Sequence, residues 1–322
     1  MSGHGCREAT RGCGPCWDRP HVRQTVPVEN TAARLPEDAD EITSFVISSS
    51  PLTDRAILRS ALSTETAAFL RVLVARRSDG ALAGVAVGRA GSNLPTGALL
   101  AIVRVSPDSR GQRVGSRLYA GLLADLPGDL TRLTAGVFHD DEASLAVARH
   151  WGFEPVGLSV TTAVDASEAS APSPVEGLTL EACDDLRFED EEAVEAMLLA
   201  SQTNPEFELG LVLSLTSFRE TPAPGQRPVA ALARVDGHPA AISFAVADGD
   251  QMHVIYTGVD PARRGSALAR RTKEFLHAHA SDQGIRTVLT DNDEENPGIR
   301  RVNEQLGYTS HSATCWMMRP RP

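Results

Sequence analysis

Two short loops in this 322-residue sequence carry residues suited to holding an anion. The chain reads VSPDSRGQRVGSRL over Val105–Leu118 and VDPARRGSALARRT over Val259–Thr272, and in both a proline precedes an Arg-Gly pair. An Arg-Gly turn that opens a helix presents unpaired backbone N–H groups, and the helix dipole favours negative charge there. Glycine lets the backbone approach closely, and arginine adds charge-assisted hydrogen bonds. The spacing therefore predicts two phosphate-binding loops.

The elements that must position these loops recur in the same order in both halves. In the first half we predict strands at 70–76, 81–90, 98–105, 130–138 and 156–164, and helices at 113–126 and 142–151. In the second half we predict strands at 229–235, 240–247, 252–259, 287–290 and 315–318, and helices at 189–201, 267–280 and 298–306. An Asp-Gly turn joins the first two of these strands in each half. The repeated order indicates a duplicated module.

A stretch with the composition of a linker divides the two copies. Residues 165–177 are rich in Ala, Ser, Pro and acidic residues and lack a sustained apolar period. We therefore predict a flexible tail at 1–22, a first domain at 23–164, a linker at 165–177 and a second domain at 178–322. The tail contains His4, Cys6, Cys13 and Cys16, but a lone C-x-x-C without a second ligand pair favours a mobile tail over a zinc site. We expect no metal.

The bulk composition excludes several classes of protein. Hydrophobic residues make up 42% of the chain and charged residues 23%, which is typical of a globular protein. The net charge of -11 argues against non-specific nucleic-acid binding. No run of about 18 apolar residues and no secretory leader is apparent, so we expect a cytoplasmic protein that does not bind membranes.

The two loops resemble the signature of the GNAT superfamily of N-acetyltransferases. That signature is V-x-P followed by Q/R-x-x-G-x-G/A, and it opens the helix that holds the pyrophosphate of acetyl-coenzyme A. Arg110 and Gly115 fall on the outer positions in the first loop, and Arg264 and Ala269 do so in the second. The resemblance implies an α/β (α+β) fold of two tandem GNAT-like domains, each a mixed, mostly antiparallel sheet flanked by helices.

The same resemblance implies acetyl-CoA or another acyl-CoA as the donor. The residues expected to bind it are Gly258, Val259, Arg264, Gly265, Ser266, Ala267, Leu268, Ala269 and Asn296 in the second half, and Val105, Arg110, Gly111, Gln112, Arg113, Val114, Gly115 and Ser116 in the first. The middle signature glycine is replaced in both loops, by Arg113 and by Ala267. An added methyl at Ala267 is the milder change, whereas the long side chain of Arg113 either contacts the donor or blocks it.

The family's proton donor is missing at its usual place. In the family a tyrosine seven residues after a later asparagine often protonates the leaving thiolate. Here Asn296 is followed at that spacing by Asn303, whereas the first half has Asp141 and Ala148. An asparagine amide can hydrogen-bond a thiol or a carbonyl but does not donate a proton at useful pKa. Because the second half keeps Asn296 and has the milder loop change, we expect it to hold the reactive site, with Asn303 there.

Two further side chains are candidates for deprotonating the incoming amine. His253 and Tyr256 lie three apart on the strand before the second loop, so we expect them to point to opposite faces and at most one to face the cleft. In the resembled fold Glu206 and Glu208 would border the acceptor site, where they can bind a cationic amine, and a solvated acidic loop is the alternative. We expect His277 and His279, on the helix after the second loop, to be surface residues.

The favoured function is transfer of an acyl group from acyl-CoA to a primary amine of a small molecule, in specialised metabolism. Two altered loops and an arginine cluster around the second of them leave an aminoacyl-tRNA open as the donor instead. A catalytically inactive ligand-binding or scaffold protein is the third hypothesis.

Overall fold

A computed structural model describes residues 29–322 apart from 51, 65–66, 92–93, 204–211 and 294–295. The first half contains β1 (Glu29–Ala32), α1 (Ala39–Ser49), α2 (Arg55–Leu62), β2 (Ala67–Arg76), β3 (Leu82–Gly91), β4 (Ala98–Val105), the 3₁₀ turn η1 (Pro107–Ser109), α3 (Val114–Leu123), β5 (Arg132–Phe138), α4 (Glu142–His150) and β6 (Glu154–Asp165). The second half contains β7 (Leu178–Cys183), α5 (Glu191–Ser201), α7 (Leu215–Glu220), β8 (Arg227–Val235), β9 (His238–Asp248), β10 (Gln251–Val259), the 3₁₀ turn η2 (Pro261–Arg263), α8 (Leu268–Asp282), β11 (Thr287–Asp293), α9 (Pro297–Gln305) and β12 (Thr309–Pro320).

The strands form one sheet of twelve, in the order β1-β2-β3-β4-β5-β12-β6-β11-β10-β9-β8-β7. All neighbouring pairs are antiparallel except β4 with β5 and β10 with β11. Each half therefore repeats the same mixed, mostly antiparallel arrangement. The predicted fold class is confirmed.

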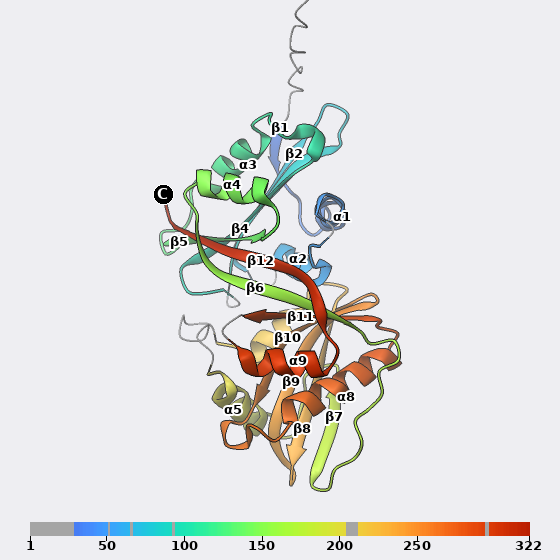
Figure 1. The fold of residues 1–322 in the computed structure, drawn as a ribbon. Coiled ribbons are helices and arrows are strands. Elements are labelled where there is room, and N and C mark those ends of the chain that lie inside the picture. The colour runs from blue at the N-terminus through green and yellow to red at the C-terminus, as the bar shows by residue number, and fades with distance from the viewer. Residues whose placement is uncertain (1–28, 51, 65–66, 92–93, 204–211, 294–295) are drawn as a thin grey trace, which may run out of the picture.

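The last strand of each half pairs with the fifth strand of the other half. β12 lies between β5 and β6, and β6 lies between β12 and β11, so the two halves exchange their final strands (Figure 1). Met317 of β12 has no exposed surface and belongs to the core of the first half. The predicted division at 164 and 178 follows the chain but does not separate two independent sheets.

Helices cover both faces of the sheet in each half. In the first half, Leu118 and Leu122 of α3 pack on one face, whereas Ile42 of α1 and Leu58 of α2 pack on the other. In the second half, α8 covers one face, and α5 and α7 cover the opposite one. Among the described residues, none of the helices combines the length and the apolar character that crossing a bilayer needs.

Helix α2 also joins the two halves. Ala56 belongs to a core cluster whose other members come from the second half, and its carbonyl accepts a hydrogen bond of 2.9 Å from Gln226 Nε2. Ser60 Oγ donates to the Thr221 carbonyl at 2.8 Å. The two halves are thus held together by helix packing as well as by the exchanged strands.

Candidate functional site

A fork between two parallel strands creates the cavity of the first half. β4 and β5 pair only from Ala98 with Arg132 to Leu100 with Thr134, and beyond that point the strands separate. A cavity of about 540 Å³ opens between the remaining residues of the two strands, the loop before α3, and α4. This volume lies in the range of small-molecule sites.

The cavity passes through the sheet. Side chains alternate between faces along a strand, and Val103 and Val105 lie on the side of α3, where they pack against its core. Gly136 and Phe138 of β5 lie on the other face, toward which Ser49 and Ser50 at the end of α1 also line the cavity. The fork therefore offers one entrance beside α3 and a second beside α1.

The first Arg-Gly loop forms one end of this cavity. Gly111 has φ 75° and Arg113 has φ 61°, so both adopt the left-handed conformation before α3 begins at Val114. Such a turn directs successive backbone N–H groups into a concave surface, and the first N–H groups of a helix have no intrahelical acceptor. Most of the predicted first-half donor residues line the cavity: Val105, Arg110, Gly111, Arg113, Val114, Gly115 and Ser116. Gln112 instead donates from Nε2 to the Asp108 carbonyl, at 2.9 Å.

Two stacked rings wall the space between α3 and α4. Tyr119 and Trp151 lie with their centroids 4.2 Å apart and nearly parallel. Burial raises the pKa of Tyr119, and the nearby Arg319 opposes this rise. Gly115 has no side chain, and a Cβ there would lie 3.4 Å from Val105 and 3.9 Å from the Trp151 ring. The glycine thus keeps open the gap through which an extended ligand can pass.

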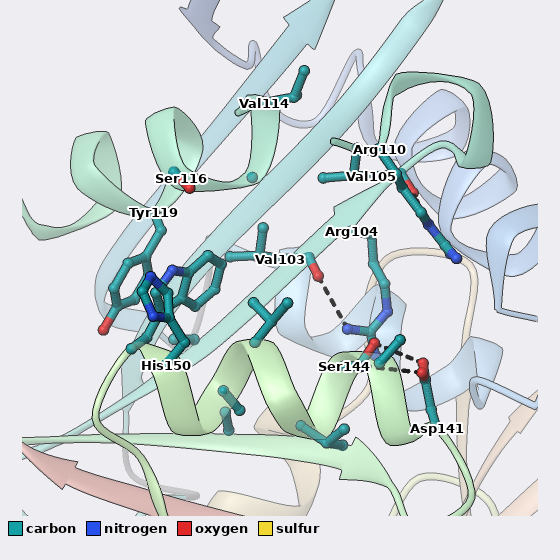
Figure 2. A pocket seen from close by; sticks show the side chains of 18 of the residues that line it. Val103, Arg104, Val105, Arg110, Val114, Ser116, Tyr119, Asp141, Ser144 and His150 are labelled. Carbon is teal, nitrogen blue, oxygen red and sulfur yellow. Dashed lines mark hydrogen bonds between the residues drawn. The ribbon is translucent and has the colours of Figure 1, made fainter. Parts of the chain in front are cut away.

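Charges of both signs meet at the fork. Figure 2 shows Arg104 reaching from β4 toward the start of α4, where Asp141 and Ser144 lie. Asp141 caps α4 and accepts hydrogen bonds from Ser144 N at 3.0 Å and from Ser144 Oγ at 2.6 Å. Burial tends to raise the pKa of Asp141, but these hydrogen bonds and the charges of Arg110 and Arg104 hold it below its usual value. Asp141 is therefore ionised at neutral pH.

The second loop has the same backbone shape, but its arginine is engaged within the protein. Gly265 has φ 80° and Ala267 has φ 61°, as in the first loop. Arg264 Nη2 donates to the Ser201 carbonyl at 3.1 Å and to Thr203 Oγ1 at 2.9 Å. Ser266 Oγ bonds the Arg263 carbonyl. Leu268 is buried and Ala269 partly buried at the start of α8.

The fork of the second half is occupied by the protein's own side chains. β10 and β11 pair as far as Val254 with Thr290. Beyond this point Tyr256 lies against Gly258, where a Cβ would come within 2.7 Å of the tyrosine hydroxyl. That hydroxyl hydrogen-bonds Ser201 Oγ at 2.7 Å. Val259 packs with a small core cluster that includes Leu268.

His253 and Tyr256 lie on the same face of the sheet, so the expectation of opposite faces is wrong. His253 pairs with Val246 and Tyr256 pairs with Phe244, because β10 contains a bulge at Ile255. The extra residue restores the two side chains to one face. His253 is 2% exposed and lies between Asp54 and Asp291, with Nδ1 2.8 Å from Asp54 and Nε2 3.3 Å from Asp291.

Asn303 is part of a buried polar cluster that includes the chain's one lysine. Lys273 Nζ donates to Asn303 Oδ1 at 2.6 Å, and Asn303 Nδ2 donates to Asn292 Oδ1 at 2.6 Å. Both Lys273 and Asn303 are at most 2% exposed. Asn296 uses its Oδ1 to cap α9, accepting from Ile299 N at 3.3 Å. Asn303 therefore has both ends of its amide committed to neighbours.

The expectation that His277 lies at the surface is also wrong. It is 5% exposed, and its Nε2 is 2.8 Å from the Tyr308 hydroxyl. The predicted acidic pair Glu206 and Glu208, and the Cys-containing tail, lie outside the described residues. Elsewhere, in the described part of the chain, no cluster of His, Cys, Asp and Glu has the arrangement of a metal site.

Several cavity residues were not singled out from the sequence as site residues, among them Arg104, Tyr119 and Trp151. The signal for Arg104 was present, because it is the one charged residue in the apolar strand ALLAIVRV. Tyr119 and Trp151 look like ordinary core aromatics in the sequence, and only the fold shows that they border the fork.

Comparisons with known proteins agree with this architecture. Residues 39–153 match the model of the acetyltransferase (GNAT) family. A tandem GNAT protein from the clavulanic acid biosynthesis pathway, solved without AcCoA, is 19% identical with a TM-score of 0.69, over 92% of this chain and 99% of that one. A GCN5-related N-acetyltransferase from Sphaerobacter thermophilus is 18% identical with a TM-score of 0.66, over 92% and 97%.

A third solved structure, a GCN5-related N-acetyltransferase from Kribbella flavida, is 19% identical with a TM-score of 0.52, over 74% of this chain and 88% of that one. No curated protein matches the sequence. The family match covers the half that contains the open cavity, and the structural likeness extends over both halves. Residues 39–153 therefore match the acetyltransferase (GNAT) family, and the chain as a whole has the fold of a tandem GNAT structure.

Proposed function

We propose that this protein is an acyl-CoA-dependent N-acyltransferase whose donor binds in the first half. The observation that carries the proposal is the cavity in the β4–β5 fork, which ends at the Arg-Gly loop of α3. Backbone N–H groups of this loop suit a pyrophosphate. The gap left by Gly115 between Val105 and Trp151 suits the narrow arm that joins the pyrophosphate to the thioester.

The amine acceptor enters the fork from the side of α1 in this proposal. Ser49 and Ser50 line the cavity there, on the face of the sheet opposite α3. The amine then attacks the thioester carbonyl directly, the C–N bond forms, and the C–S bond breaks with loss of thiolate. Ala148 stands where the family has its tyrosine acid, so positioning of the two reactants in one cleft supplies most of the acceleration.

The second half has a supporting role in this proposal, which reverses the division expected from the sequence. Arg264 is held by Ser201 and Thr203, and Tyr256 lies over Gly258. A donor in this fork would have to displace these side chains. A small-molecule amine of specialised metabolism and a cytoplasmic location complete the proposal.

A matched pair of variants tests which half holds the donor. Gly115→Leu fills the gap beside Trp151, and Ala269→Leu makes the equivalent change at the start of α8. Calorimetry with acetyl-CoA should show micromolar binding to the wild type and to Ala269→Leu, and at least tenfold weaker binding to Gly115→Leu. Loss of binding in Ala269→Leu alone would place the donor in the second half. Absence of binding to the wild type with acetyl-CoA and with longer acyl-CoAs would contradict the proposal itself.

A further inference from the structure

The side chain of Arg104 carries a positive charge into the fork. Arg104 pairs in the sheet with Val85, whose side chain belongs to the core beneath α1 and α2. Paired residues of antiparallel strands point to the same face, so Arg104 leaves β4 on the acceptor side. Its guanidinium then lies in the fork and lines the cavity.

The guanidinium of Arg104 has no carboxylate partner within the described part of the chain. Among the described residues, Arg104 Nη1 donates one hydrogen bond, to the carbonyl of the neighbouring Val103 at 3.1 Å. The side chain is partly buried, and burial lowers the pKa of Arg104, with Arg110 adding to this effect and Asp141 opposing it. A desolvated cation without a counterion is unfavourable, so the free protein is prepared for an anion that arrives with a ligand.

A stable anion on the ligand fits better than one that exists only during the reaction. The oxyanion of the tetrahedral intermediate does not exist while the substrates bind, so the charge of Arg104 would have no partner at that stage. A carboxylate compensates it in the bound state and matches the planar, forked guanidinium with two hydrogen bonds. The donor's pyrophosphate has its own site at the loop before α3, on the other side of the sheet.

Asp141 supplies the complementary charge. It is ionised, it lines the same cavity, and it interacts electrostatically with Arg104. The two side chains are not ion-paired with each other, because no nitrogen of Arg104 lies within 4.0 Å of a carboxylate oxygen among the described residues. The fork thus presents a separated cation and anion, which is the arrangement that a zwitterion neutralises.

We propose that the acceptor is a free amino acid, whose carboxylate is bound by Arg104 and whose ammonium is attracted by Asp141. This inference rests on the proposed function and specifies its acceptor. The ammonium loses one proton to solvent before attack, and the nitrogen then forms the amide bond as the thioester C–S bond breaks. One further proton leaves the nitrogen, and the departing thiolate takes up one proton. The products are an N-acyl amino acid, free coenzyme A and one proton.

Acceptors that differ only in the carboxylate test the role of Arg104. The twenty amino acids and their carboxamides are assayed with acetyl-CoA by release of free thiol. For the best amino acid, the wild type should prefer the acid over its amide by about 100-fold in kcat/KM. Arg104→Gln should reduce that preference to less than threefold, chiefly through KM, while the Kd for acetyl-CoA changes less than twofold. Arg104→Lys should keep an intermediate preference.

A second variant separates the two charges. Asp141→Asn should lower kcat/KM for acids and amides by similar factors, because both carry the ammonium, so the preference between them should survive. Equal turnover of acids and amides by the wild type would overturn the proposal. So would an Arg104→Gln variant that loses a preference for succinyl-CoA over acetyl-CoA but keeps its preference among acceptors, since the carboxylate would then belong to the acyl group.

Direct binding keeps this inference distinct from the proposed function. Calorimetry without any donor should detect the preferred amino acid on the wild type, and Arg104→Gln should weaken that binding at least tenfold. If acetyl-CoA binds but no amino acid binds or reacts, the acceptor assignment fails and the donor assignment stands. If amino acids bind through Arg104 but no acyl-CoA binds, the donor assignment fails and the acceptor assignment stands.

Discussion

His253 of β10 and Asp54 at the start of α2 are joined by a hydrogen bond of 2.8 Å between Nδ1 and Oδ2, and this bond links the two halves of the chain. Asp54 also caps α2, accepting from Ile57 N at 2.9 Å. On its other side, His253 Nε2 lies 3.3 Å from Asp291. Burial tends to lower the pKa of His253, but the hydrogen bonds and charges of Asp291 and Asp54 raise it to about 10.

We expect His253→Gln to lower the free energy of unfolding by about 3 kcal/mol at pH 7, because two carboxylates lose the cation between them. The folded pKa is above the unfolded value, so the contribution of His253 is complete below about pH 6.5 and is lost as the pH rises through 10. Urea unfolding at pH 6.5 and pH 10.5 measures the difference between variant and wild type. His279→Gln removes a more exposed pair with Asp184 and should cost less than about 1 kcal/mol. A His253 effect that grows with pH would contradict this assignment.

Lys273 should influence stability with the opposite sign. Burial lowers the pKa of Lys273 to about 7. Between pH 7 and about 10.5 the unfolded chain holds this proton and the folded chain does not, so the contribution of Lys273 to stability rises with pH, by up to about 1.4 kcal/mol per pH unit. The free energy of unfolding of the wild type relative to Lys273→Met, measured by urea unfolding, should therefore rise steadily from pH 7 to about pH 10.5. Parallel curves would show that Lys273 keeps an ordinary pKa.

The left-handed residues at the start of α3 and α8 should be relieved by glycine. Arg113 and Ala267 both have φ 61°, a conformation that costs a residue with a Cβ about 1 kcal/mol. Arg113→Gly and Ala267→Gly should therefore each raise the free energy of unfolding by about 0.5 kcal/mol or more, after the added entropy of the unfolded glycine. Ser266→Gly, next to Ala267 but with negative φ, is the control and should destabilise. Chemical denaturation measures the free energy of unfolding of all three variants. A loss of stability in both Arg113→Gly and Ala267→Gly would show that the left-handed residues are not strained.

The two loop arginines should respond differently to removal. Arg110 lines the open cavity and donates from Nε to the Val105 carbonyl at 3.4 Å, whereas Nη2 of Arg264 is bonded to Ser201 and Thr203. Arg110→Ala should lower kcat/KM for acyl transfer by at least tenfold, which corresponds to loss of about 1.4 kcal/mol or more of charge-assisted interaction. Arg264→Ala should leave kcat/KM within about threefold, although it can lower stability. Unchanged turnover in Arg110→Ala with loss in Arg264→Ala would return the active site to the second half.

Much of the fold followed from the sequence because its signals are local. Alternating apolar residues and Asp-Gly turns located the strands, and β4 was predicted with the bounds that the structure has, at Ala98–Val105. The bulge at Ile255 was not predictable, because QMHVIYTGV contains nothing that marks where an extra residue falls. The loop sequences also led to an expectation that we now revise in our proposal, because they favoured the second half as the site of donor binding. The contacts that occupy its arginine come from Ser201 and Thr203, some sixty residues earlier in the chain.

The exchange of β6 and β12 could not be predicted from the sequence either, because the sequence of a strand does not determine which strand it pairs with. The exchange leads to a further prediction. Met317 is fully buried in the first-half core although it belongs to the last strand of the chain. Met317→Ala should lower the free energy of unfolding by about 3 kcal/mol, whereas Met318→Ala, which is partly exposed, should cost clearly less. Hydrogen exchange followed by mass spectrometry should show β4 and β10 losing protection together in Met317→Ala, because the exchanged strands couple both halves. Protection retained in β10 while β4 exchanges freely would show instead that the halves unfold separately despite their shared sheet.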